Sequence, residues 1–231
     1  MTFMSEFFAS RWIGDFLFAF GALFAIINPY GLAFIFLDRT MGLSDGERAR
    51  VALRVALYAF AVMLGSLFVG AQVLKIFGIS MPALRIAGGL VVAAAGWSML
   101  HAPTAAPGAH ATSTANFAIV QRMAFFPLTI PLTTGPGTIA TAIAIGTHRP
   151  DDLDGLFTSS IVSFVVAMAV SATIYHAYSK AGVMARLFGE EGTSVVTRLS
   201  AFLLLCVGVQ IMLTGVSELA RTILETASRT S

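Results

Sequence analysis

Long apolar runs separated by short polar stretches dominate the chain. A helix needs about 20 apolar residues to cross the hydrocarbon core of a bilayer, and several of these runs approach or exceed that length. The strands of a membrane β-barrel would instead alternate apolar and polar residues. The pattern therefore predicts an all-α membrane protein with six transmembrane helices. The expected spans are residues 13–37, 51–74, 81–100, 123–145, 156–178 and 195–216.

Local signals mark where several of these helices begin. Ser44-Asp45-Gly46-Glu47 fits a capping box and predicts a helix that starts at Ser44 and leads into the second span. Pro82 falls in the first turn of the third span, where a helix tolerates proline. Pro150-Asp151-Asp152 precedes the fifth span, with acidic residues placed for its first turn. Trp12 and Tyr178 lie near span ends and fit interfacial anchoring.

Proline and glycine interrupt two of the predicted spans. The first span is broken at Asn28-Pro29-Tyr30-Gly31 and the fourth at Gly135-Pro136-Gly137. A proline within a helix removes a backbone hydrogen bond, and glycine permits conformations that other residues resist. In hydrocarbon the freed backbone groups need partners, so unwound segments occur only inside protein or against a water-filled cavity. We therefore expect helices 1 and 4 to be broken.

The two breaks occupy matching positions in the two halves of the chain. The interval from Pro29 to Pro136 is 107 residues, and Ser44 and Asp151 are separated by the same interval. This spacing indicates an internal repeat of three helices. An odd number of spans per repeat requires the second copy to insert upside down, so we predict two inverted three-helix repeats. The expected division is residues 1–100 for the first repeat, 101–122 for a linker and 123–231 for the second repeat.

Paired breaks in inverted repeats are typical of a transporter's substrate site. The half-helix after each break presents free N–H groups, which suit a carboxylate, and the half-helix before it presents carbonyls, which suit a cation or an ammonium group. A small zwitterionic amino acid matches both. The competing interpretation is that the prolines only kink the helices to shape their packing. The predicted substrate-binding residues are Asn28, Pro29, Gly31, Thr134, Gly135, Pro136, Gly137 and Thr138.

The polar side chains at the breaks have structural alternatives. Asn28 either contacts substrate or caps the half-helix that begins near Pro29, and both roles can hold at once. Thr133, Thr134 and Thr138 flank the second break, where threonine commonly bonds back to helix carbonyls.

Arg85 and Arg198 are the charges set deepest in apolar sequence, 113 residues apart. Each lies near the start of its span and can extend to the membrane interface. The functional alternative is a gate or ion pair that switches during transport. The larger interval between them, compared with the breaks, indicates a small insertion before the last helix.

Composition and charge narrow the function. Only 11% of the residues are charged and the net charge of +2 is scattered, which gives no indication of nucleic-acid binding. The single cysteine, Cys206, excludes an intrachain disulfide, and no zinc or haem spacing is present. No nucleophile–base pair is recognisable, and His101 and His110 fall in the predicted linker, so we expect neither an enzyme nor a cofactor.

Lysine and arginine near the span ends predict the orientation. Eight lie on the side of the loops that follow helices 1, 3 and 5, and six lie on the other side. Because positive charge favours the cytoplasmic side, this bias places both termini outside the cytoplasm.

Three motifs resemble the MarC family of bacterial and archaeal membrane proteins. They are residues 28–31 (NPYG), 77–89 (FGISMPALRIAGG) and 126–137 (FPLTIPLTTGPG), and the similarity extends over nearly the whole chain. The resemblance implies a six-helix inner-membrane protein that is related to small neutral amino acid transporters and, distantly, to the LysE exporter group. Tyr30 departs from the small or aliphatic residue common after Asn-Pro in the family.

The favoured interpretation is a secondary transporter or exporter of small neutral amino acids such as alanine, glycine, serine and threonine, coupled to H⁺ or Na⁺. One alternative is a non-transporting membrane component of an envelope complex, which predicts tightly packed breaks with no cavity. Another is an exporter of a different small solute. The direction of transport, the coupling ion and the oligomeric state are left open by the sequence.

Overall fold

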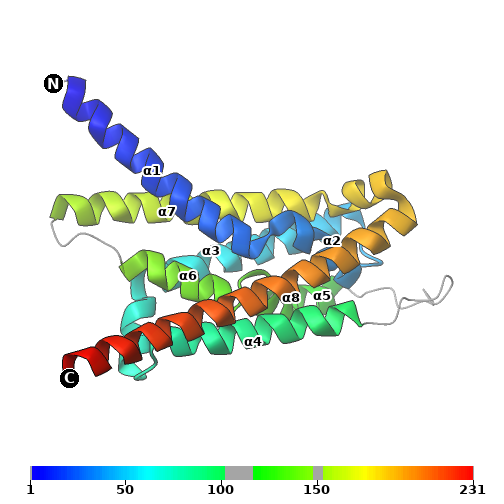
Figure 1. Ribbon diagram of the computed structural model, residues 1–231. Helices are drawn as coiled ribbons and strands as arrows, with labels where there is room; N and C mark the ends of the chain where they lie inside the picture. Colours follow the sequence, from blue (N-terminus) through cyan, green and yellow to red (C-terminus); the bar gives the residue numbers. More distant parts are fainter. Residues whose placement is uncertain (1, 102–116, 148–152, 231) are drawn as a thin grey trace.

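The computed structural model describes residues 2–101, 117–147 and 153–230, which are almost entirely helical (Figure 1). The predicted linker as far as residue 116 and the predicted helix start at Asp151 lie outside these residues. The helices are α1 (Thr2–Ile27), α2 (Pro29–Arg39), α3 (Asp45–Ile76), α4 (Met81–Leu100), α5 (Phe117–Arg122), η1 (Ala124–Thr133), α6 (Pro136–Thr147), α7 (Leu153–Ser179) and α8 (Ala181–Thr230).

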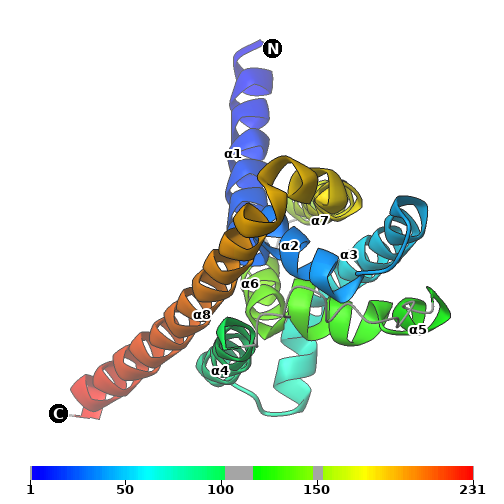
Figure 2. The same ribbon diagram turned by 90° about the vertical axis from the view of Figure 1, so that its right-hand side faces the viewer.

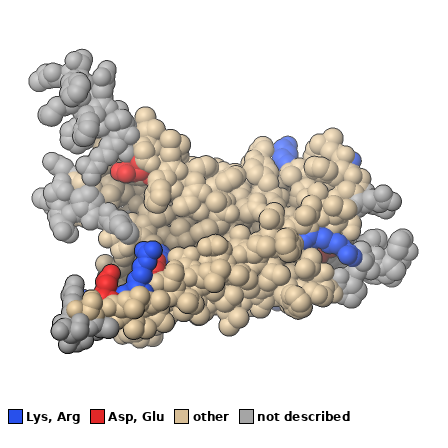
Figure 3. Space-filling view, in the orientation of Figure 1, with Lys and Arg blue, Asp and Glu red and all other residues tan. Residues whose placement is uncertain are grey.

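The described helices confirm an all-α membrane protein. Five stretches are long and apolar enough to cross a membrane, and η1 with α6 supplies a sixth if this pair, bent by 68°, is counted as one span. Charged residues gather at the two ends of the molecule and leave a broad uncharged band between them (Figure 3). Such a band suits contact with lipid, which does not exclude apolar side chains as water does. The five stretches are Trp12–Arg39, Asp45–Ile76, Met81–Leu100, Gly155–Ser179 and Ser194–Glu225.

The predicted starts of two helices are confirmed by their caps. The Glu47 N–H donates to the Ser44 hydroxyl at 3.3 Å, and the Ser44 N–H donates to the Glu47 carboxylate at 3.0 Å, which completes the capping box. The Ala83 N–H donates to the Ser80 hydroxyl at 3.3 Å at the start of α4, and Pro82 lies in its first turn. These bonds satisfy backbone donors that the first turn of a helix leaves unpaired.

The two halves are arranged as inverted repeats. In Figure 1, α3 runs opposite to α7 and α4 runs opposite to α8, while the span α1–α2 runs opposite to η1–α6. Contacts follow the same exchange: α3 packs on α7, α4 packs on α8, and α1 contacts α7 as α6 contacts α3. This pattern is expected of copies related by a two-fold axis in the membrane plane.

The last helix begins earlier than its predicted span. Residues 181–188 are already helical, and a non-helical Gly189, at φ 70°, separates them from the rest of α8. In Figure 2 these first turns of α8 lie beside the end of α7, and the helix then changes direction toward the C-terminus. The Phe188 ring meets Phe34 of α2 edge-on, with centroids 5.8 Å apart, which holds the first turns against the first repeat.

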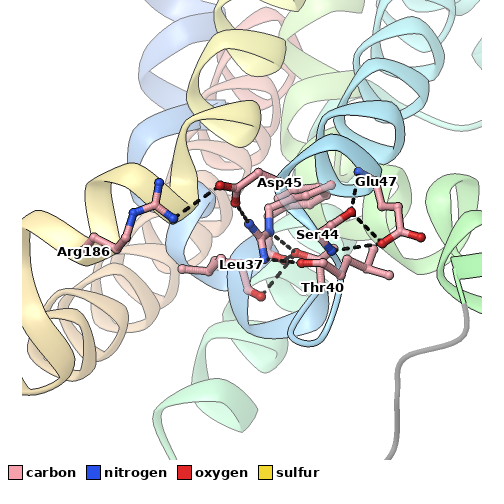
Figure 4. A network of polar contacts seen from close by, with 9 residues as sticks. Leu37, Thr40, Ser44, Asp45, Glu47 and Arg186 are labelled. Atoms are coloured by element: carbon pink, nitrogen blue, oxygen red, sulfur yellow. Dashed lines mark hydrogen bonds and ion pairs between the residues drawn. The ribbon is translucent and has the colours of Figure 1, made fainter.

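A polar network closes one end of the bundle (Figure 4). Arg48 of α3 is buried, with 7% of its surface exposed, and its guanidinium donates to the Leu43 carbonyl at 3.0 Å and to the Thr40 hydroxyl at 3.3 Å. It also pairs with Asp45 at 2.7 Å. Asp45 in turn pairs with Arg186 of α8 at 3.3 Å. The network therefore joins the turn after α2, the start of α3 and the first turns of α8.

Glycines bring the backbones of α4 and α8 into direct contact. A Cβ added to Gly96 would lie 2.5 Å from the Leu205 nitrogen, and one added to Gly89 would lie 2.5 Å from the Gly208 carbonyl oxygen. Real Cβ atoms do not approach other atoms so closely. Small residues permit this close approach of membrane helices, whose association depends on van der Waals contact. The sequence-based assignment of Gly89 and Gly96 to helix packing is confirmed.

Replacement of Gly96 by leucine should destabilise the bundle. The new side chain has no space against α8, and overpacking costs typically about 1–3 kcal/mol. Gly65→Leu is the matched control, because Gly65 lies on α3 with nothing within 4 Å of an added Cβ. In detergent, Gly96→Leu should melt at a clearly lower temperature than Gly65→Leu. Equal melting temperatures would contradict the close packing of α4 on α8.

Candidate functional site

The first break is a kink of one residue. Asn28 adopts a left-handed conformation, φ 45° and ψ 61°, between α1 and α2. Its side-chain oxygen accepts a hydrogen bond from the Gly31 N–H at 3.3 Å, while Pro29 is buried at the start of α2. The Leu32 N–H still donates to the Asn28 carbonyl at 3.0 Å. The predicted capping role of Asn28 is confirmed, and its contact with a ligand stays a prediction.

Gly31 and Tyr30 are positioned by this cap. A Cβ on Gly31 would clash with the side chain of Asn28, so glycine is needed there for the cap to form. Tyr30 is 41% exposed and points to the outside, where its ring lies near Phe24 with centroids 6.4 Å apart. The tyrosine that distinguishes this chain at the first break therefore does not face the centre of the bundle.

The second break is much wider than the predicted Gly135–Gly137. Phe126 and Ile130 have extended, non-helical backbone within η1, and regular helix resumes only at Pro136. Pro127 and Pro131 directly follow the two extended residues, which agrees with the preference of residues before proline for extended backbone. These two prolines are the signal by which the sequence could have indicated the full width of the break.

Threonines supply hydrogen bonds along the irregular segment. The Thr129 hydroxyl donates to the Ala124 carbonyl at 2.6 Å, and the Thr133 hydroxyl donates to the Leu128 carbonyl at 2.6 Å. The Thr134 hydroxyl donates to the Thr129 carbonyl at 3.3 Å. The expected back-bonding of threonine is therefore confirmed for Thr133 and Thr134. It leaves these two hydroxyls without a proton to donate to a ligand.

A small cavity lies against the second break. Four of its lining residues belong to the break and the start of α6: Thr133, Gly135, Gly137 and Thr138. The opposite walls are apolar side chains of α1, α4 and α8. Its volume of about 20 Å³ holds about one water molecule.

The predicted site residues are divided between the cavity and its surroundings. Gly135, Gly137 and Thr138 line it, whereas Asn28, Pro29, Gly31, Thr134 and Pro136 do not. The first repeat reaches the cavity through Ile26, two residues before Asn28, and an added Cβ on Gly137 would lie 3.8 Å from the Ile26 side chain. The end of α1 and the start of α6 therefore meet, although the Asn28 cap itself stands beside the cavity.

The start of α6 is the most polar part of the wall. Thr138 is buried, and no hydrogen bond to its hydroxyl is present among the described residues. The N–H groups of Gly137 and Thr138 lie in the first turn of α6, where an α-helix leaves donors without intrahelical partners. These donors and the helix dipole favour a negatively charged ligand group.

The two arginines singled out in the sequence lie away from the cavity. Arg85, mostly buried near the start of α4, forms an ion pair with Glu218 of α8. Arg198 lies on the exposed surface of α8. The ion pair predicted for Arg85 is present, and a switching role for it stays a prediction.

Tyr178 corrects one sequence-based assignment. Instead of anchoring at the membrane interface, its side chain is fully buried, with 0% exposed, and its hydroxyl lies 2.9 Å from the Thr133 hydroxyl. No sequence signal marks this contact, because the two residues are 45 positions apart. His101, the one linker histidine among the described residues, has its Nδ1 2.9 Å from the Trp97 carbonyl. Within the described residues, no group of three or more His, Cys, Asp or Glu side chains is placed to hold a metal.

Comparison with known proteins matches residues 14–220 to the profile of a family described as "MarC family integral membrane protein". A relative from Citrobacter koseri is 33% identical over 207 residues, which cover 87% of this chain and 93% of the relative. A relative from Salmonella arizonae is 35% identical over 213 residues, with the same coverage. Both are named inner membrane protein MarC. No solved structure matches the chain.

The Arg85–Glu218 pair should contribute measurably to the stability of the α4–α8 contact. Arg85→Gln and Glu218→Gln should each lower the melting temperature in detergent, and the double variant should melt no lower than the worse single variant. The expected coupling is about 0.5–1 kcal/mol, because the pair is partly exposed. Arg221→Gln, an exposed position on α8, is the control and should melt like the wild type. Strictly additive effects of the two changes would argue against the pair.

Proposed function

The chain belongs to the MarC family of integral membrane proteins, and from this premise we propose that it is a secondary transporter or exporter of small neutral amino acids. The observation that supports this proposal best is the cavity at the second break, where backbone donors of α6 meet an otherwise apolar wall. Broken helices around a central cavity are the usual construction of substrate sites in transporters with inverted repeats.

Both charged ends of an amino acid find suitable groups around the cavity. The first turn of α6 offers the N–H groups of Gly137 and Thr138, together with the Thr138 hydroxyl, to the carboxylate. The carbonyl ends of α1 and η1 lie on the other side of the two breaks and favour the ammonium group. Backbone groups bind what all amino acids share, so the side chains of the wall are left to discriminate by size.

The dimensions of the cavity favour small substrates and require movement. A volume of about 20 Å³ holds a single water molecule, and even glycine is several times larger. The walls must therefore separate to admit a substrate. Gly89 and Gly96 hold α4 against α8, so the apolar wall formed by these two helices moves most readily as one unit against α1 and α6. Such movement of one bundle against another is the usual form of alternating access.

We further propose a location in the bacterial inner membrane with both termini outside the cytoplasm, and coupling to H⁺ or Na⁺. The names of the relatives support the location. The cavity argues against the alternative of a non-transporting component of an envelope complex, since that role predicted tightly packed breaks. An exporter of a different small solute is the second outcome that an assay must distinguish.

Uptake or counterflow in proteoliposomes tests the proposed function. We expect the wild type to carry labelled alanine, glycine, serine or threonine, and Thr138→Val to raise the KM about 5- to 10-fold through the loss of one hydrogen bond to the carboxylate. Thr214→Val is the matched control, because the Thr214 hydroxyl bonds to the Gln210 carbonyl on the exposed face of α8.

Two results would oppose this proposal. Folded wild-type protein that carries none of the four amino acids would exclude the substrate class. Purification in mild detergent as a stable complex with other envelope proteins, without flux, would favour the non-transporting alternative.

A further inference from the structure

Tyr178 of α7 stands between the two broken helices. Its ring stacks on Phe36 of α2, with centroids 4.4 Å apart and planes inclined by 18°. Its hydroxyl lies 2.9 Å from the hydroxyl of Thr133 at the end of η1. One face of this buried side chain therefore contacts the half-helix that follows the first break, and its polar end contacts the half-helix that precedes the second break.

The direction of the hydrogen bond between the two hydroxyls follows from counting protons. Thr133 has one hydroxyl proton, and it is donated to the Leu128 carbonyl, which can only accept, at 2.6 Å. Tyr178 must therefore donate its own proton to Thr133. A buried tyrosine hydroxyl usually requires such a partner. The Thr133 oxygen is thereby held in place, and all that it can offer to a further group is a lone pair.

We infer that Tyr178 is a positioning residue of the substrate site, which holds the Thr133 hydroxyl as a hydrogen-bond acceptor for the ammonium group of the substrate. Thr133 lines the cavity, whereas Tyr178 acts through it. The opposite polarity exists at the start of α6, where the N–H groups suit the carboxylate. The two polar ends of the cavity then orient a zwitterion in one direction. This inference rests on the proposed function.

The same contact ties substrate binding to the first repeat. Thr133 belongs to η1 and Phe36 to α2, and Tyr178 touches both. A displacement of Thr133 on substrate binding is therefore transmitted through the tyrosine ring to α2. A tyrosine that served only to fill the core would lack this link between the cavity and the half-helix beyond the first break.

The test is the KM for alanine in proteoliposomes, measured with Tyr178→Phe, which keeps the ring and its stacking but removes the donated hydrogen bond. Tyr175→Phe is the matched control, because Tyr175 lies on the same helix with its side chain exposed. We expect Tyr178→Phe to raise the KM about 5- to 10-fold with little change in the maximal rate, as for the loss of one hydrogen bond. Tyr175→Phe should behave like the wild type.

Variants of Thr133 keep the test decisive if Tyr178→Phe folds poorly. Thr133→Ser retains the hydroxyl and should keep the wild-type KM, whereas Thr133→Val should raise it as Tyr178→Phe does. The double variant of Tyr178→Phe with Thr133→Val should be no worse than Thr133→Val alone, since both changes remove one interaction.

The outcomes separate this inference from the proposed function. If the wild type transports alanine and Tyr178→Phe changes only the melting temperature, with the KM of the Tyr175→Phe control, the positioning role is wrong and the proposed function stands. An unchanged KM in folded Thr133→Val would overturn the positioning role in the same way. If the folded wild type transports no amino acid, both proposals are overturned.

Discussion

The structure depends on one constraint: backbone groups freed inside a membrane must find partners within the protein. Unsatisfied N–H and C=O groups cost several kcal/mol each in hydrocarbon, where no water can replace the lost hydrogen bond. The chain meets this constraint in two ways. At the first break the Asn28 side chain accepts from the first turn of α2. Along η1 the hydroxyls of Thr129, Thr133 and Thr134 donate to carbonyls of the preceding turns.

Much of the fold was predictable because its determinants are local. Apolar length indicates the spans, and the capping box at Ser44 sets the start of α3 through neighbours in sequence. The extra helical turns at residues 181–188 were missed because they depend on contacts with the first repeat, such as Asp45 with Arg186. A pattern of apolar residues has no means of indicating an ion pair that joins residues 141 positions apart.

The candidate site was predictable only in part, for the same physical reason. Proline and glycine mark where a helix is interrupted, so the positions of the breaks were visible. Which residues then line a cavity is decided by packing between helices. Gly135 and Gly137 reach the cavity, whereas Gly31 is needed for the Asn28 cap and stays outside it. The burial of Tyr178 against Phe36 is a tertiary contact that overrides the usual interfacial position of tyrosine at a span end.

The repeat explains why the polar contacts of the cavity come from one half only. With the interval of 107 residues, Ile26 corresponds to Thr133 and Ala71 corresponds to Tyr178. Both Ile26 and Thr133 line the cavity, so the symmetric fold brings equivalent positions to the same place. The second repeat has a hydroxyl where the first has an aliphatic side chain, and it has a tyrosine to hold that hydroxyl. A symmetric pair of polar walls would bind a zwitterion equally well in two orientations, whereas one polar and one apolar wall favour a single orientation. The inverted repeat thus supplies the scaffold, and the departures from symmetry supply the direction.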